Sequence, residues 1–177
     1  MIAQKLRGSF IELAPPPVDD LMKVRRVELL EPMEWMTCRP VLFRTDEEAA
    51  ARMEAVLQDA ALCLWGIYDL KSKGVLGKVT AFDHNPRNRS MEVGYYLCPE
   101  YRGNGIMNEA MTLALGWLFN QRLNKIYAQT GSFNEASARL LERLGFHQDG
   151  RLRQHHELDG TLYDDLVYSI LESEFNI

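Results

Sequence analysis

Residues 92–111 read EVGYYLCPEYRGNGIMNEAM, and the character of this stretch changes twice along its length. It begins as an apolar strand, passes through Pro99, Gly103 and Gly105, and continues as a helix. The first N–H groups of a helix lack partners within it and carry the positive end of the helix dipole. A strand, a glycine turn and a helix start are therefore a common way to present backbone amides to a phosphate.

Three interpretations of this turn compete. In the first, Gly103 and Gly105 only shape the connection between strand and helix. In the second, the turn is a dinucleotide fingerprint, but Asn108 stands where a third glycine is required, and no acidic residue clearly takes the ribose role. In the third, the amides of residues 103–107 bind a pyrophosphate and Arg102 adds a charged donor. The turn alone leaves the first and third interpretations open, and the missing Gly-Lys-Ser/Thr excludes a Walker loop.

The composition is that of an ordinary folded protein. The chain has 177 residues, of which 46% are hydrophobic and 25% are charged, which suffices for a buried core. We expect one domain over residues 1–177. The net charge of −5 argues against general binding to nucleic acid or to a membrane, both of which favour a basic excess.

The three cysteines, Cys38, Cys63 and Cys98, are widely spaced and odd in number. They form no CxxC pair or Cys/His cluster in the sequence, so we expect reduced thiols, no metal site and no covalent acyl-cysteine. The N-terminal residues lack the apolar region of a signal peptide, and no run approaches the ~18 apolar residues of a membrane span. These features predict a cytoplasmic protein.

The segments before residue 92 predict strands and helices in a mixed order. Residues 61–69 and 74–84 are expected to form two antiparallel strands. A strand near residues 9–14 precedes them and ends at three prolines. Between these strands we expect one helix capped by Asp19 or Asp20 that runs to about Leu30, and a second from Thr45 or Asp46 to about residue 59.

The segments after residue 92 continue the same architecture. The helix that follows Gly105 is expected to reach about residue 120, and residues 125–131 form another strand. Asn134 begins a further helix that ends at the cap glycine Gly145, and the chain closes as a hairpin that turns near residues 158–160. This order predicts the α/β (α+β) class, with a single mixed, mostly antiparallel twisted sheet and about four helices.

Two motifs resemble the GCN5-related N-acetyltransferase (GNAT) family, most closely its ribosomal-protein serine/alanine N-terminal acetyltransferase branch. The acyl-CoA signature Arg/Gln-x-x-Gly-x-Gly/Ala is represented by Arg102, Gly105 and Met107, although Met107 departs from the small residue expected last. The second motif, Asn-x-x-Ser with Gly-Phe after its helix, lies at residues 134–146 as Asn134, Ser137, Gly145 and Phe146. The likeness covers the order of elements over nearly the whole chain.

The resemblance implies an acyl-CoA site with acetyl-CoA as cosubstrate and no metal. The strand at residues 91–98 is expected to splay from its parallel neighbour at residues 125–131, and the acyl-pantetheine arm pairs with it. One freed N–H there would stabilise the oxyanion, a contribution of ~3 kcal/mol. The cofactor-binding residues that the resemblance implies are Tyr96, Leu97 and Cys98 for the arm, Arg102, Gly103, Asn104, Gly105, Ile106 and Met107 for the pyrophosphate, and Asn134 and Ser137 near the thioester.

The resemblance leaves the proton chemistry open. Leu141 stands where most family members carry a tyrosine acid, so Ser137 is the implied acid, or else only a contact to CoA. Glu92 is a candidate base that could instead be structural. His156 is a second candidate base, while His155 and His156 cannot both point inward from a regular strand.

Two further features accompany these candidates. Asp164 and Asp165 are expected to be structural or to lie at the substrate edge. Trp35 is expected in the wall of the acceptor site.

The sequence therefore predicts an acyl-CoA-dependent N-acetyltransferase that moves an acetyl group to a primary amine by direct attack in a ternary complex. The acceptor is a protein N-terminus or a small amine, and a homodimer is plausible by resemblance. A catalytically degenerate acyl-CoA-binding sensor of the same fold is the alternative, because Leu141 replaces the usual acid. A nucleotide-binding oxidoreductase is the third class, which NAD rather than CoA would protect against heat.

Overall fold

The computed structural model describes residues 3–32, 38 and 45–175. Within these residues the chain forms eight strands, four α-helices and two short 3-10 helices. The strands are β1 (Leu6–Arg7), β2 (Ile11–Ala14), β3 (Cys63–Asp69), β4 (Val75–Asn85), β5 (Ser90–Leu97), β6 (Lys125–Gly131), β7 (His147–Leu158) and β8 (Thr161–Leu171). The helices are α1 (Val18–Glu28), α2 (Asp46–Gln58), η2 (Pro99–Tyr101), α3 (Ile106–Asn120), α4 (Glu135–Arg143) and η3 (Glu172–Glu174).

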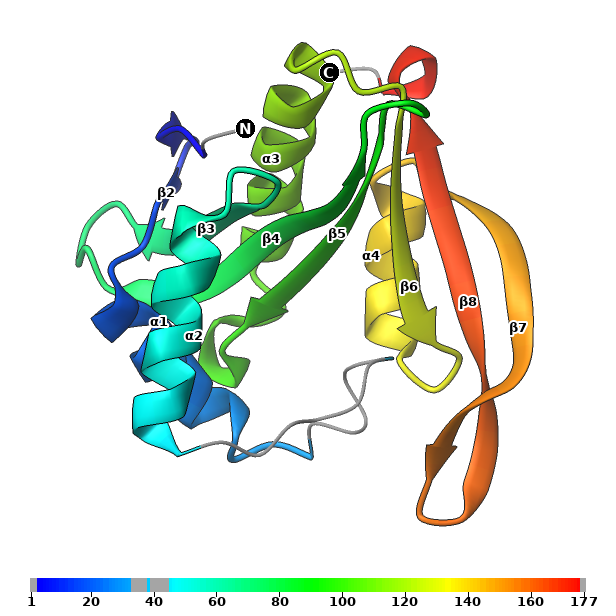
Figure 1. The fold of residues 1–177 in the computed structure, drawn as a ribbon, viewed down its shortest axis with the longest axis horizontal. Helices are drawn as coiled ribbons and strands as arrows, with labels where there is room; N and C mark the ends of the chain where they lie inside the picture. Colours follow the sequence, from blue (N-terminus) through cyan, green and yellow to red (C-terminus); the bar gives the residue numbers. More distant parts are fainter. Residues whose placement is uncertain (1–2, 33–37, 39–44, 176–177) are drawn as a thin grey trace.

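The strands form one sheet in the order β1-β2-β3-β4-β5-β6-β8-β7 (Figure 1). Every neighbouring pair is antiparallel except β5 and β6, which are parallel. The predicted mixed, mostly antiparallel sheet and the four helices are thus confirmed. The two-residue strand β1 was not predicted, because a segment this short carries no alternating pattern.

Two helix starts show how the sequence sets the elements. Thr45 caps α2 through a capping box, in which its hydroxyl accepts from the Glu48 amide and the Glu48 carboxylate accepts from the Thr45 amide. The predicted cap of α1 was wrong, since α1 begins after Pro17 and has no side-chain cap. Asp19 and Asp20 lie instead in the first turn, where a negative charge favours the helix dipole.

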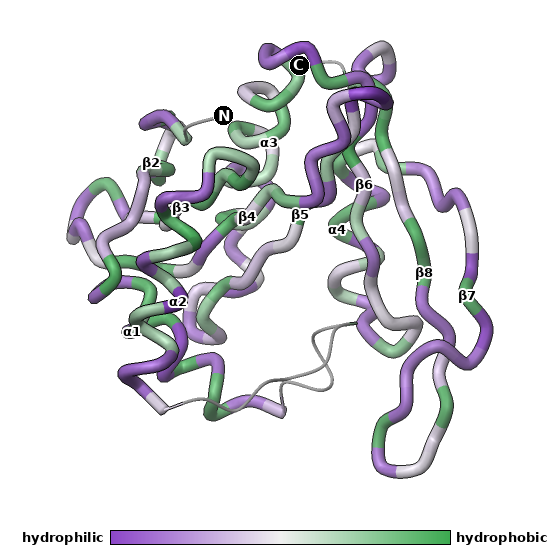
Figure 2. Tube along the Cα trace, in the orientation of Figure 1, coloured by the Kyte–Doolittle hydropathy of each residue, from purple (hydrophilic) through white to green (hydrophobic). Residues whose placement is uncertain are grey.

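Helices α1 and α3 cover opposite faces of the sheet. Leu97 of β5 packs in the main core with α3, whereas its neighbours Tyr96 and Cys98 pack with Val24 of α1. Successive side chains of a strand point to opposite faces, so the two helices lie on different sides. Figure 2 shows apolar residues gathered in α3 and polar ones along the outer strand β7, most of which is exposed.

The parallel pair β5 and β6 is joined over only a short length. Residues Ser90–Glu92 pair with Lys125–Tyr127, and beyond them the two strands diverge (Figure 1). The predicted splayed central strands are therefore present. Among the helices that the structure describes, none combines the length and the hydrophobicity that a membrane crossing requires.

Candidate active site

A cavity of about 780 Å³ lies where β5 and β6 diverge. Its walls come from β4, β5 and β6, from the loop before α3, and from α4. Most of the predicted site residues line it: Glu92, Tyr96, Leu97, Arg102, Gly103, Gly105, Ile106, Met107, Asn134 and Ser137. Cys98, Asn104 and His156 are not among the described residues that line it.

The loop before α3 has the backbone that an anion-binding turn requires. Gly103 and Gly105 have φ angles of +79° and +77°, a left-handed conformation that residues with a Cβ adopt at a cost. A Cβ placed at either glycine would meet nothing within 4 Å. Gly105 is the N-cap of α3 and offers no side chain to its first amides, and the loop that carries these amides lines the cavity.

Arg102 is held by partners within the protein. Both terminal nitrogens of its guanidinium donate to the Glu31 carboxylate at 2.8 Å, and its Nε donates to the Leu97 carbonyl at 2.9 Å. The Tyr96 hydroxyl donates to the same carboxylate at 2.5 Å. Burial alone would raise the pKa of Glu31, but the hydrogen bonds from Arg102 and Tyr96 outweigh it and hold the pKa below its usual value.

Alternate backbone N–H groups of β5 point toward β4 and toward the gap that opens between β5 and β6. The Cys98 amide donates to the Leu76 carbonyl of the neighbouring hairpin, and the Cys98 carbonyl accepts from the Tyr101 amide. The Cys98 amide is thus engaged within the protein, and only its carbonyl oxygen could accept a further bond from a pantetheine arm. The role predicted for Cys98 stays a prediction. Because backbone groups alternate along a strand, the amides of Leu97 and Tyr95 face the gap between β5 and β6 beyond the last paired residues.

Tyr95 was missed by the sequence analysis. Its hydroxyl lies 2.7 Å from the Ser137 hydroxyl, so β5 and α4 are joined inside the cavity. Ser137 is fixed further by Asn134, whose side-chain oxygen caps α4 by accepting from the Ser137 amide at 3.1 Å. Burial raises the pKa of Tyr95 to about 12, although the hydrogen bond with Ser137 lowers it. The phenol therefore stays protonated at neutral pH.

A signal for Tyr95 exists in the sequence. Leu141 stands where the resemblance implies a tyrosine acid and is fully buried in the core, so an acid on another element was the place to search. Tyr95 and Ser137 are 42 residues apart, and only the fold brings them together.

Glu92 lies in the same cavity on the other face of β5. Its residue is only 8% exposed, and it pairs in register with Tyr127 of β6 at the last joined position of the two strands. Glu92 and Tyr95 are an odd number of positions apart, so their side chains point to opposite faces of the strand. The point where the strands separate is thus flanked by a carboxylate on one side and a hydroxyl pair on the other.

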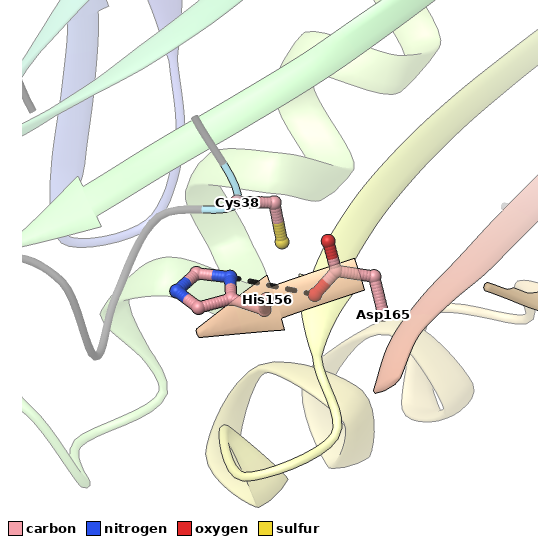
Figure 3. Close-up of side chains that lie close together, drawn as sticks. All are labelled: Cys38, His156 and Asp165. Atoms are coloured by element: carbon pink, nitrogen blue, oxygen red, sulfur yellow. Dashed lines mark ion pairs between the residues drawn. The ribbon is translucent and has the colours of Figure 1, made fainter. Parts of the chain in front are cut away.

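His156 lies beside this cavity, next to Asp165 and Cys38 (Figure 3). The His156 side chain is 10% exposed, while His155 is exposed, so only one of the two histidines points inward. The expectation that no cysteine lies beside a histidine was wrong, since Cys38 lies next to His156. The sequence did not show this contact because the two residues are far apart in the chain. Trp35, predicted in the acceptor wall, lies outside the described residues.

Comparisons with known proteins agree with this geometry. The family model described as "Acetyltransferase (GNAT) domain" matches residues 11–147. The uncharacterized N-acetyltransferase YoaA of Bacillus subtilis is 34% identical over 119 residues, which are 67% of each chain. The ribosomal protein uS5-alanine N-acetyltransferase of Escherichia coli is 28% identical over 60% of this chain and 56% of its own length. The spermidine N(1)-acetyltransferase of Vibrio cholerae is 29% identical over 58% and 60%.

The fold is also that of a solved acetyltransferase. The GNAT-family acetyltransferase of Bacillus anthracis superposes with a TM-score of 0.82 over 97% of this chain and 100% of that one, at 17% identity. The aligned stretches span between half and two-thirds of the curated relatives' own lengths.

Proposed function

The chain belongs to the GNAT acetyltransferase family, and on this premise we propose that it transfers an acetyl group from acetyl-CoA to a primary amine by direct attack in a ternary complex. The observation that carries the proposal is the placement of Glu92 and the Tyr95–Ser137 pair on either side of the point where β5 and β6 separate. A thioester held there would have a base on one side and a proton donor on the other.

The cofactor end of the cavity fits an acyl-CoA. The outward amides of β5 can pair with the pantetheine arm as if it were a further strand, and the amides of the Gly103–Gly105 turn can receive the pyrophosphate. The phosphate role predicted for Arg102 remains a proposal, because its guanidinium is engaged by Glu31. Asn134, through its cap of α4, positions Ser137 at the same site.

The reaction requires two proton movements. The incoming ammonium gives a proton to Glu92, and the freed nitrogen attacks the thioester carbonyl carbon. The C–S bond then breaks, and the CoA sulfur takes a proton from the hydroxyl pair, with Tyr95 and Ser137 acting as one donor unit. The second proton of the attacking nitrogen is lost as the amide forms and restores the proton of this pair, so the proton on Glu92 is the one released to solvent. An outward amide of β5 stabilises the oxyanion, a contribution of about 3 kcal/mol.

We do not propose His156 as the general base, although the sequence made it a candidate. It does not line the cavity among the described residues, whereas Glu92 does, so we propose Glu92 as the base. A location in the cytoplasm and a homodimer remain predictions.

The acceptor is a primary amine of one of two kinds. Relatives are named for a ribosomal-protein alanine terminus and for spermidine. Both are cationic before transfer, and Glu92 places a carboxylate in the cavity where β5 and β6 separate, while the Glu28 carboxylate is paired with Lys78 at 2.7 Å. We therefore propose a cationic amine as the acceptor class.

Release of CoA thiol from acetyl-CoA, measured with a panel of peptide N-termini, polyamines and amino acids, tests the proposal. Amine-dependent release supports an enzyme. Tight CoA binding without release across the panel would establish the sensor alternative. The loss of any CoA binding, with NAD protecting the protein against heat, would point to an oxidoreductase instead.

A further inference from the structure

Three side chains with metal-binding atoms meet at the edge of the cavity. Cys38 Sγ, one imidazole nitrogen of His156 and a carboxylate oxygen of Asp165 all lie within 4.8 Å of one another. Figure 3 shows the sulfur directed at the space between the imidazole ring and the carboxylate. The His156 Nδ1 to Asp165 Oδ1 distance is 3.5 Å.

Asp165 carries an unsatisfied atom in this cluster. The residue is fully buried, and its Oδ1 has no hydrogen-bond partner among the residues that the structure describes. The other oxygen, Oδ2, accepts from the side-chain Nε2 of Gln129 at 2.8 Å. This bond fixes the carboxylate with Oδ1 toward His156. A buried carboxylate oxygen without a hydrogen bond is costly unless a positive charge compensates it.

The local backbone presents His156 to this oxygen. Pairing of β7 with β8 is irregular between Leu152 and His156, where four positions of β7 span two of β8. Gln154 has a φ of +51° at this bulge, and its amide donates to the Asp164 carboxylate at 2.8 Å. The extra residues leave His155 exposed and turn His156 inward beside Asp165.

We propose that Cys38, His156 and Asp165 form a binding site for a divalent cation of the Zn²⁺ type. Thiolate, imidazole and carboxylate are the ligands this ion takes, and ligand atoms around a tetrahedral Zn²⁺ are about 3.4–3.6 Å apart. The 3.5 Å between His156 and Asp165 already fits this spacing. A movement of the thiol toward the other two ligands completes it, and the fourth position is left to water.

The site joins parts of the chain that lie on two sides of the cavity. Cys38 falls between α1 and α2 in the sequence and lines the cavity, whereas His156 and Asp165 belong to the β7–β8 hairpin. A bound cation would therefore link the segment at Cys38 to this hairpin. Metal binding to the folded state alone should raise the unfolding temperature with increasing metal concentration.

Titration of the apo protein with Co²⁺ tests the site without acetyl-CoA or any amine, so its outcome does not depend on the proposed transferase activity. We expect one equivalent to bind with thiolate-to-cobalt charge-transfer absorption, to be displaced by Zn²⁺, and to raise the unfolding temperature. Cys38→Ala should abolish the charge-transfer band, and His156→Gln and Asp165→Asn should each weaken binding more than tenfold.

The chain supplies a matched control for each ligand. Cys63→Ala, His155→Gln and Asp19→Asn change the same residue types outside the cluster and should leave the affinity unchanged. If Asp165→Asn fails to fold, Cys38→Ala and His156→Gln carry the test. Absence of saturable binding at micromolar Co²⁺ and Zn²⁺, or a charge-transfer band that survives Cys38→Ala, would overturn the assignment.

Discussion

Tyr95 of β5 and Ser137 of α4 share a hydrogen bond of 2.7 Å between their hydroxyl oxygens, across the cavity where β5 leaves β6. Leu141, one turn further along α4, is buried in the core and offers no hydroxyl, so this pair is the proton donor that we propose. Two hydroxyls in contact can pass one proton, and either oxygen can be the donor.

Tyr95→Phe and Ser137→Ala should each lower kcat by about 100-fold, with little change in the affinity for CoA. Because the two hydroxyls act as a unit, the double variant should be hardly slower than the slower single variant. Steady-state thiol release measures all three. Tyr127→Phe, whose hydroxyl bonds to Asp83 instead, is the control. Fully additive losses would show that the hydroxyls act separately.

The pH profile of this pair follows from the raised pKa of Tyr95, about 12. A phenol with this pKa keeps its proton from pH 6 to 10, so the alkaline limb should show no fall in rate from loss of that proton. The same upward shift implies a contribution to folding stability that is complete below about pH 10, the unfolded value. This contribution is lost as the pH rises through 12. Ultraviolet phenolate absorbance during alkaline titration checks it against Tyr95→Phe.

Glu92→Gln should lower kcat about 100-fold or more, because the ammonium then has no carboxylate to receive its proton. The isosteric amide keeps the shape of the side chain, so the binding of CoA should remain. Raising the pH should restore part of the rate, since more of the amine is then free of its proton. A variant with unchanged kcat near pH 7 would remove Glu92 from the mechanism. His156→Gln compares the second candidate base directly.

Gly105→Val should abolish CoA binding, because a branched side chain is strained at a φ of +77° and projects toward the cavity mouth. Gly160→Val is a matched control. Gly160 also has a φ of +77° with open space around it, but it lies in the β7–β8 turn. Both variants should lose similar stability in thermal unfolding, and only Gly105→Val should lose CoA affinity in calorimetry. Retained affinity would refute the placement of the pyrophosphate.

Gly77→Ala should displace β5, the strand proposed to pair with acyl-CoA, by a clash from the neighbouring strand β4. A Cβ on Gly77 of β4 would stand 2.2 Å from the Tyr96 carbonyl oxygen and 2.9 Å from the Leu97 Cα. The backbone of β5 must move toward the gap, so we expect a loss of about 1–3 kcal/mol in the free energy of unfolding and weaker CoA binding. Gly74→Ala, on the same hairpin with its nearest contact at 3.4 Å, should do neither. Chemical denaturation and calorimetry measure the two effects.

The Glu31–Arg102 pair should make stability depend on acid pH. The pKa of Glu31 is lowered in the folded state, so its contribution is present above the usual value of 4.5 and is lost as the pH falls through the folded value. Glu31→Gln should cost about 1 kcal/mol or less at pH 7, and this cost should shrink as the pH falls through the folded pKa of Glu31. Denaturation from pH 3 to 7 checks this. Arg102→Gln should flatten the profile in the same way, and a steep profile in both variants would assign it to other carboxylates.

The sequence predicted the parts of the site whose residues are close in the chain. Local signals predict three such features: glycines predict the turn at Gly103 and Gly105, a capping residue predicts the helix start at Asn134, and alternation predicts the strand that ends near Leu97.

The remaining parts depend on contacts between distant segments. Tyr95 meets Ser137 only after β5 and α4 are packed, and Glu31 reaches Arg102 across 71 positions. The bulge that turns His156 inward has no local signature, because it is defined by pairing with β8. The cysteines therefore form no cluster with a histidine along the sequence, but the fold brings Cys38 next to His156.

The short junction of β5 with β6 has a consequence for how the molecule opens. Three residue pairs connect the half-sheet of β1 to β5 with the half-sheet of β6, β8 and β7. Amides beyond that junction should exchange with solvent by local separation of the halves, at a free energy below that of global unfolding. An acyl-CoA bound between the two half-sheets would hold them together for as long as it stays bound. Its arrival should slow hydrogen exchange at Tyr95 and Leu97 far more than in the helices.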